Sequence, residues 1–270
     1  MLEGTFRGPG PHLLTGPIHI EGAEPGDVIE VRVLDLQLRA DWGWNLQVPT
    51  LGTLPEDFPE FRRIHIPLDR KRNIAKMAWG QELPLAPFFG NFGVAPPPSW
   101  GRLSSKEPRV FGGNMDNKEL GVGSTVYFPV FVPGALFSAG DGHALQGDGE
   151  VCLTAIEAAL TGTLEFHLRR DLHLASPRAE TPDGWITMGF DEDLDDAAKA
   201  ALRDMIQLIR PTQRPECARR LHAVLDCGRP AGYANGRWQQ RRPLRSREIA
   251  HAGQFFLIGE IFRWLARAAD

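Results

Sequence analysis

The sequence is short of several features that would mark a specialised class of protein: cysteine pairs, strong net charge and long apolar runs. Among 270 residues there are three cysteines, and the formal net charge is -4. Cys152, Cys217 and Cys227 have neither metal-type nor redox-type spacing, so we expect a reducing, cytoplasmic environment. The small negative charge argues against nucleic acid as a general partner. No apolar run approaches the roughly 20 residues of a membrane-spanning helix, and the start lacks signal-peptide features.

Glycine and proline are plentiful, with 29 and 22 residues, which is typical of a chain with many turns between short strands. Val28–Leu38 alternates apolar and polar residues, and its doublet Val33–Leu34 predicts a β-bulge. Val126–Val132 is apolar on both faces and predicts a buried strand, in which Pro129 favours an edge position or a bulge.

Two further strands are predicted at Val151–Ile156 and Thr163–Leu168, and helix appears late in the chain. Asp195–Ile209 has apolar residues at helical spacing and acidic residues at its start. The same spacing predicts a short helix within Phe255–Leu265. The sequence therefore predicts an α+β fold that is predominantly β, with a late helix.

The segment Gly140–Glu150, GDGHALQGDGE, is the strongest candidate for a functional site. It contains three carboxylates, one imidazole and one amide within ten residues, and its glycines allow sharp turns. These residues are Asp141, His143, Gln146, Asp148 and Glu150. Oxygen-rich ligands with one imidazole suit zinc, calcium or manganese better than iron–sulfur or haem, and we expect zinc or calcium here. An ordinary turn between two strands is the alternative, although a turn needs neither histidine nor glutamine.

A second glycine-rich segment, Gly112-Gly-Asn-Met-Asp116, supplies Asn114 and a remote carboxylate. Taken alone, Asp116 is equally well explained by a turn. Together, Asp116, Asp141 and His143 are predicted to hold the metal, which would lower the pKa of a water molecule and polarise a carbonyl. Glu150 or Asp148 would then take and return the proton, with Gln146 beside them.

Other residues are weaker candidates. His12 and His19 lie near the start and are more typical of histidines at the surface or the edge of a core. Cys152 falls within a predicted strand and is expected in the core. Ser138 lacks the glycine-flanked motif of a serine nucleophile.

Several uncommon blocks of this sequence resemble the acetamidase/formamidase family, in the family's order and almost continuously from about Gly10 to Ile209. The blocks are TGPIHIEGAEPGD (Thr15–Asp27), PFFGNFGVAPP (Pro87–Pro97), GGNMDNKEL (Gly112–Leu120), the stretch Leu120–Glu150, and PRAETPDGWITMGFDEDLDDA (Pro177–Ala197). The resemblance implies a β-rich α+β fold, a divalent metal and a homo-oligomer. It also implies an enzyme that hydrolyses short linear amides such as formamide and acetamide to a carboxylate and ammonia.

Carried onto this sequence, the resemblance gives Asp116, Asp141, His143 and Glu150 as metal or water-activating residues, with Gln146 and Asp148 nearby. Two rival functions remain at this point. One is hydrolysis of a small cyclic amide, a lactam, at the same site. The other is a catalytically inactive, metal-binding remnant of the family.

The sequence departs from the family pattern at both ends. Family members carry several tens of residues before the TGP block, so we expect residues 1–210 to be a family domain that is incomplete at its N-terminus. Pro211–Gln254 contains nine arginines, no lysine and two cysteines.

Back-translating Arg219–Arg242 with permitted codons and shifting the frame by one base can reproduce a family-like closing block. We therefore interpret residues 211–270 as an arginine-rich tail derived from a frameshift near Arg210. The alternative is a genuine basic arm that binds an acidic partner. On the frameshift interpretation, weak activity or none is expected of this chain.

Overall fold

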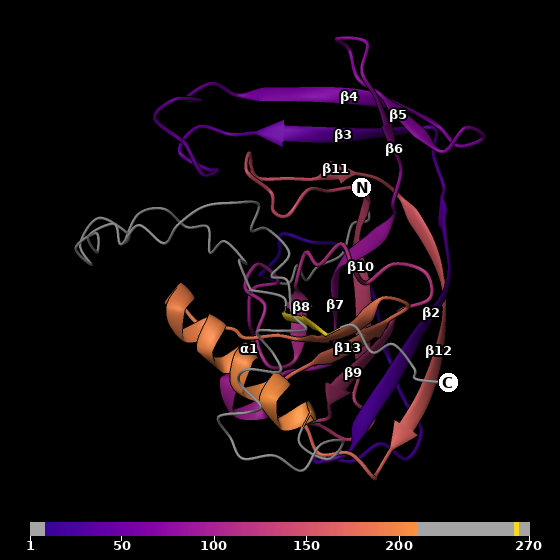
Figure 1. Ribbon diagram of the computed structural model, residues 1–270, viewed down its shortest axis with the longest axis vertical. Coiled ribbons are helices and arrows are strands. Elements are labelled where there is room, and N and C mark those ends of the chain that lie inside the picture. The colour runs from indigo at the N-terminus through magenta and orange to yellow at the C-terminus, as the bar shows by residue number, and fades with distance from the viewer. Residues whose placement is uncertain (1–8, 210–261, 265–270) are drawn as a thin grey trace.

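The computed structural model describes residues 9–209 and 262–264, which form two antiparallel sheets and one long helix (Figure 1). The predicted α+β, predominantly β fold with a late helix is confirmed. The elements are β1 (Leu14–Ile18), β2 (Val28–Leu38), β3 (Trp42–Gln47), β4 (Arg62–Asp69), β5 (Ile74–Lys76), β6 (Glu82–Pro84), β7 (Phe88–Gly93), the 3-10 turn η1 (Pro98–Trp100), β8 (Gly112–Asn114), β9 (Thr125–Pro129), β10 (Phe137–Leu145), β11 (Ile156–Glu157), β12 (Leu160–Arg169), β13 (Arg178–Thr181), β14 (Gly184–Thr187), α1 (Leu194–Ile209) and β15 (Phe262–Trp264).

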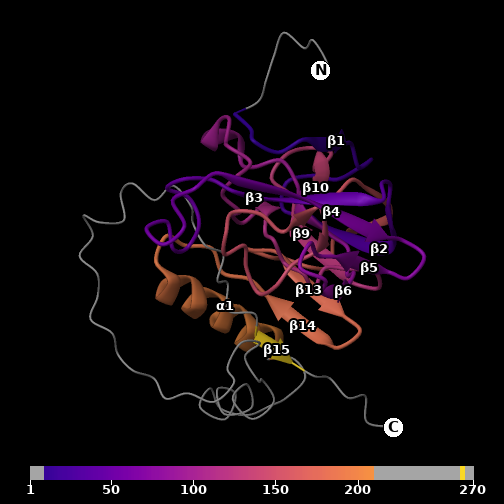
Figure 2. The same ribbon diagram turned by 90° about the horizontal axis from the view of Figure 1, so that it is seen from above.

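The first sheet has the order β6-β5-β4-β3-β11-β10-β7-β8, and β1 pairs with β10 beside this path. The second sheet has the order β12-β2-β9-β13-β14-β15. Helix α1 contacts β14, beside which it lies in Figure 2, and Figure 1 shows it far from β4. No helix in the described part of the chain is long and apolar enough to span a membrane.

Strand β2 confirms the predicted bulge. Its partner β12 shifts register so that Thr163 opposes Asp35 while Leu164 opposes Val33, which leaves Leu34 without an opposite residue. Leu34 is about half exposed, whereas Ile29, Val31 and Val33 are buried in the main core. The extra residue thus returns the strand to its inward and outward alternation.

The main core lies between the two sheets and is rich in phenylalanine. Phe92 of β7, Phe128 of β9 and Phe137 of β10 are almost fully buried and contact one another through their rings. Strand β9 is central in its sheet, between β2 and β13, so the edge position that Pro129 favoured is wrong. Pro129 is the last residue of the strand, where a missing N–H is tolerated. Backbone pairing continues past it, since Val130 N–H donates to the carbonyl of Asp27. This core fixes the strands that carry the candidate site.

Two predicted elements are wrong. Residues 151–154 form a turn and only Ile156–Glu157 of this region is a strand, so Cys152 lies in a loop and contacts Asn45 instead of packing in a core. Phe262–Trp264 pairs with β14 as a strand rather than a helix. The rest of the tail, residues 210–261 and 265–270, lies outside the described residues, so the boundary at Arg210 and the frameshift stay predictions.

Candidate functional site

Strands β10 and β11 place three acidic or basic side chains on one face of the first sheet. Asp141 and His143 are two residues apart on β10, and their side chains lie on the same side, since a Cβ built on Gly90 would be 2.7 Å from each. His143 is directly opposite Glu157 of β11, which brings the glutamate alongside the imidazole. Asp141 and His143 therefore lie on a strand, and not on the glycine-hinged loop that the sequence suggested.

Two loops bring further carboxylates to the same place. Asp116 follows β8 in a left-handed backbone conformation with a φ of 45°, and its N–H donates to the carbonyl of Gly90. Glu150 belongs to the loop after β10, where its Oε1 accepts a hydrogen bond of 2.8 Å from the N–H of Ala155. The same N–H donates to Glu157 Oε1 at 3.1 Å, so one backbone group holds both glutamates.

Gln146 determines which nitrogen of His143 carries a hydrogen. Gln146 Nε2 donates to the backbone carbonyl of Asp116 at 2.7 Å, and a carbonyl can only accept. The amide oxygen of Gln146 is therefore the atom 2.9 Å from His143 Nδ1, which must donate to it. In the neutral ring this leaves Nε2 with a bare lone pair. His143 is fully buried, and Nε2 makes no hydrogen bond with any described residue.

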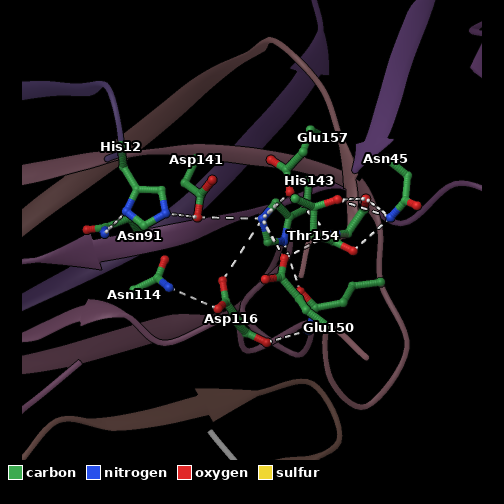
Figure 3. A network of polar contacts seen from close by, with 12 residues as sticks. His12, Asn45, Asn91, Asn114, Asp116, Asp141, His143, Glu150, Thr154 and Glu157 are labelled. Atoms are coloured by element: carbon green, nitrogen blue, oxygen red, sulfur yellow. Dashed lines mark hydrogen bonds and ion pairs between the residues drawn. The ribbon is translucent and has the colours of Figure 1, made fainter. Parts of the chain in front are cut away.

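Four carboxylates surround this nitrogen (Figure 3). The distances from His143 Nε2 to their nearest oxygens are 3.4 Å for Glu157, 3.5 Å for Glu150, 3.6 Å for Asp141 and 4.0 Å for Asp116. All exceed the usual 2.7–3.2 Å of a hydrogen bond. Two ligands of one tetrahedral zinc ion, each about 2.1 Å from the metal, are about 3.4 Å apart. The spacing therefore suits ligands around a cation better than hydrogen-bonded partners.

The crowding of negative charge has clear electrostatic effects. Burial and the neighbouring carboxylates raise the pKa of Asp116, that of Glu150 to about 7 and that of Glu157 to about 8. Burial by itself lowers the pKa of His143, but the carboxylates around it outweigh burial and raise the pKa to about 10. A divalent cation would compensate this excess of negative charge.

The ligand atoms form two groups, each spanning no more than 4.8 Å, that share His143. One group adds Asp141 and Glu157 from the strands, and the other adds Asp116 and Glu150 from the loops. Carboxylate oxygens with one imidazole are a donor set that suits zinc and also calcium. The residues present thus fit the metal that the sequence predicts.

Gly90 of β7 forms the floor of the cluster. A Cβ atom built on it would lie 2.7 Å from each of Asp116 Oδ1, Asp141 Oδ2 and His143 Cε1. The ligand side chains therefore pack directly on the backbone of β7, and any side chain at this position would displace them.

His12 lies at the edge of the cluster, although the sequence suggested a surface or core-edge histidine. Its Nε2 is 3.7 Å from Asp141 Oδ2. Its Nδ1 is 3.0 Å from the carbonyl and 2.9 Å from the hydroxyl of Ser105, and Asn91 donates to the same carbonyl. These contacts fix the ring with Nε2 toward Asp141, as Figure 3 shows for His12, Asn91 and Asp141.

The structure brings together most of the residues predicted from the sequence. Asp116, Asp141, His143, Gln146 and Glu150 all meet in one cluster. Their individual roles are not shown by the geometry and stay predictions.

Asp148 is the exception, because it does not reach the cluster. Its carboxylate is 69% exposed and lies 2.6 Å from Lys118 Nζ. The chain leaves β10 at Leu145, so Asp148 falls in the outward part of the following loop. Its position gives no support to a catalytic role.

Glu157 was missed in the sequence. The available signal was an acidic residue inside the apolar run Ala155-Ile-Glu-Ala-Ala-Leu160, where an unpaired carboxylate would be costly to bury. Glu157 is 8% exposed and lies 3.4 Å from His143 Nε2, where a bound cation would offset its charge.

Comparison with known proteins places this cluster in context. The profile of the Acetamidase/Formamidase family matches residues 9–105 and 102–182. A formamidase from Methylophilus methylotrophus is 33% identical over 200 residues, which cover 55% of this chain and 49% of that protein. The chain spans about half the length of the curated relatives it matches.

Solved structures show the same likeness. A predicted acetamidase/formamidase from Thermoanaerobacter tengcongensis has a TM-score of 0.75 and 32% identity, covering 80% of this chain and 70% of that one. A gamma lactamase from Delftia acidovorans has a TM-score of 0.59 and 25% identity, covering 77% of this chain and 68% of that one.

Proposed function

The chain belongs to the acetamidase/formamidase family, and from this premise we propose that it is an amidase that hydrolyses short linear amides. Its substrates would be amides such as formamide and acetamide, and its products a carboxylate and ammonia. The observation that supports this most directly is the buried Nε2 of His143, without a hydrogen-bond partner among the described residues and facing four carboxylates. The relatives named formamidase and acetamidase support the choice of amide.

We place the divalent ion, zinc or calcium, at His143 with Asp141 and Glu157. All three lie on paired strands and are held by the main sheet. Asp116, which the sequence suggested as a ligand, forms the other group with Glu150 on the loops, around the same nitrogen of His143. When bound, such an ion lowers the pKa of water toward neutrality and polarises a substrate carbonyl.

The chain's own residues would supply the proton transfers and the orientation. Glu150 takes a proton from the attacking water and returns it to the departing nitrogen, since its carboxylate faces the centre and is anchored through Oε1 by Ala155 N–H. Gln146 keeps the hydrogen of His143 on Nδ1 and so keeps Nε2 available. Burial of the cluster excludes bulk water, which strengthens each of these interactions.

The proposal is tested with the purified full chain, dialysed against chelator and reloaded with zinc or calcium. We expect stoichiometric metal by elemental analysis and release of ammonia from formamide or acetamide. A chain that binds metal but releases no ammonia would favour the inactive-remnant alternative. Absence of both would reject the function.

Hydrolysis of a small lactam is the second candidate, and the similarity to the Delftia gamma lactamase favours keeping it. Parallel turnover of acetamide and of a five-membered lactam by the same preparation separates the two. We further propose a homo-oligomer in the cytoplasm, to be measured by light scattering and by fractionation.

A further inference from the structure

Asn114 has a buried acceptor that the metal cluster does not use. Its Nδ2 donates to Asp116 Oδ2 at 3.2 Å. Its Oδ1 is buried and accepts no hydrogen bond from any described residue. A buried acceptor without a donor costs free energy, so its retention beside a candidate active site requires an explanation.

The orientation of this amide is fixed by its neighbour. The nitrogen of Asn114 faces Asp116, since Nδ2 donates to Asp116 Oδ2. The oxygen is then turned away from Asp116, toward the side of the cluster where His12 and Asp141 lie (Figure 3). Asn114 is directly opposite Asn91 in the β7–β8 pairing, and its hydrogen bond to Asp116 places the amide beside the cluster.

Two carboxylates of the cluster, those of Asp116 and Asp141, bring further acceptors to this side. Asp116 Oδ1 and Asp141 Oδ2 flank the same point above Gly90, where a Cβ would lie 2.7 Å from each. A corner of carboxylate and amide oxygens repels a substrate carbonyl or a product carboxylate. It attracts a group that carries N–H bonds and presents no lone pair, and the NH₂ of a primary amide is such a group.

We propose that Asn114 is a specificity-determining residue whose Oδ1 accepts a hydrogen bond from the nitrogen of a primary amide substrate. The inference rests on the proposed function and assigns a residue to the recognition of its substrate. The nitrogen carries N–H bonds from amide to ammonia, so the contact is kept through the reaction. An ester of the same acid has no N–H to offer and gains nothing from Asn114.

The test compares acetamide with methyl acetate in wild type and Asn114→Ala, both reloaded with zinc. Asn117→Ala is the matched control, because Asn117 is a buried amide three residues away whose Oδ1 accepts from Glu119 N–H. We expect Asn114→Ala to lose roughly tenfold in kcat/KM for acetamide and to keep its turnover of methyl acetate within about twofold. Since the ratio of the two substrates is measured on one preparation, partial unfolding does not affect it.

Equal losses on both substrates would overturn the inference, because they would mean that Asn114 acts only by positioning Asp116. A lower zinc affinity in Asn114→Ala would also overturn it, since Oδ1 would then be a metal ligand.

If the chain is inactive, calorimetric titration with acetamide measures substrate binding in place of turnover. If wild type binds acetamide without releasing ammonia, the proposed function fails, and binding about tenfold weaker in Asn114→Ala would still support the inference. Equal binding, or none by wild type, would overturn it.

Discussion

His143 shows how much of the chemistry at this centre is decided by single hydrogen bonds. The backbone carbonyl of Asp116 fixes the amide of Gln146, and Gln146 fixes the hydrogen of the imidazole. In the neutral ring that metal binding requires, the lone pair of Nε2 then faces the four carboxylates. Glu157 and Glu150 are almost equidistant from His143 Nε2, yet we expect different results when each is replaced.

Glu157→Gln should lower zinc affinity by 10-fold or more, whereas Glu150→Gln should keep zinc and lose turnover. Glu157 is paired with His143 across β10 and β11, so it is held in place as a ligand. Glu150 is on a loop and suits proton transfer, which typically contributes 10²–10⁴-fold in rate. Zinc affinity by competition with a chromogenic chelator and ammonia release separate the roles. Glu165→Gln, on the partly exposed β12, is the control. Retention of zinc by Glu157→Gln would contradict the ligand set proposed here.

Strand β2 could be predicted from the sequence, whereas strand β10 could not. The alternation in Val28–Leu38 predicted β2 and its bulge at Leu34, because a register shift changes which side chains are buried. The glycines of Gly140–Glu150 suggested a loop, yet Gly140 and Gly142 lie within β10. There a Cβ would meet the carbonyls of Leu13 and Ala158 at 2.4 and 2.5 Å. They are needed for close approach of neighbouring chain segments, which local sequence patterns do not reveal.

The ligand side chains pack directly on Gly90 of β7, so this strand is sensitive to a single added methyl group. Gly90→Ala should abolish zinc binding and destabilise the fold, because its Cβ would lie 2.7 Å from two ligand oxygens and from the ring of His143. Gly121→Ala is the matched control, since the nearest atom to its Cβ, the carbonyl oxygen of Pro87, is 3.7 Å away. Elemental analysis and thermal denaturation of both variants give the result. Zinc bound equally by wild type and Gly90→Ala would show that the cluster is not packed on β7.

The pairing of β2 with β12 provides a prediction for acid stability. Glu30 is buried, and burial raises its pKa, but hydrogen bonds from Arg169 and Arg32 outweigh burial and leave the pKa below its usual value. A lowered pKa in the folded state means that this contribution to stability is present above about pH 4.5. It is lost as the pH falls through the folded pKa.

Wild type should therefore lose more stability between pH 5 and pH 3 than Glu30→Gln does. At pH 7, Glu30→Gln should be less stable than wild type by roughly 1–3 kcal/mol, because two arginines lose their charged acceptor. Urea denaturation of both proteins at each pH measures this. The site carboxylates titrate in both proteins, so their effect cancels in the comparison. An equal acid loss in both proteins would contradict the assignment.

At the scale of the whole molecule, the centre joins segments that are far apart in the chain. His12 precedes β1, Asp116 follows β8, and Asp141, His143 and Glu157 come from β10 and β11. The sequence could supply the types of ligand, because carboxylates and one histidine recur within a few residues. It could mark Glu157 as an acidic residue in an apolar run, but not its pairing with His143 or the approach of His12, since these depend on strand order and register. Because the candidate ligands come from distant segments, a bound cation would connect the first sheet to the loops that carry Asp116 and Glu150.

Metal binding should therefore stabilise the entire described domain. Without a cation, four carboxylates converge on one imidazole, and their mutual repulsion opposes folding. An ion that binds only the folded chain adds about 2.7 kcal/mol when its free concentration is 100 times its Kd. We expect urea denaturation midpoints to rise with zinc in wild type and not in His143→Ala, whose cluster lacks the shared ligand. If zinc raised both midpoints equally, the stabilising ion would lie elsewhere, and the convergence of carboxylates on His143 would no longer indicate a metal centre.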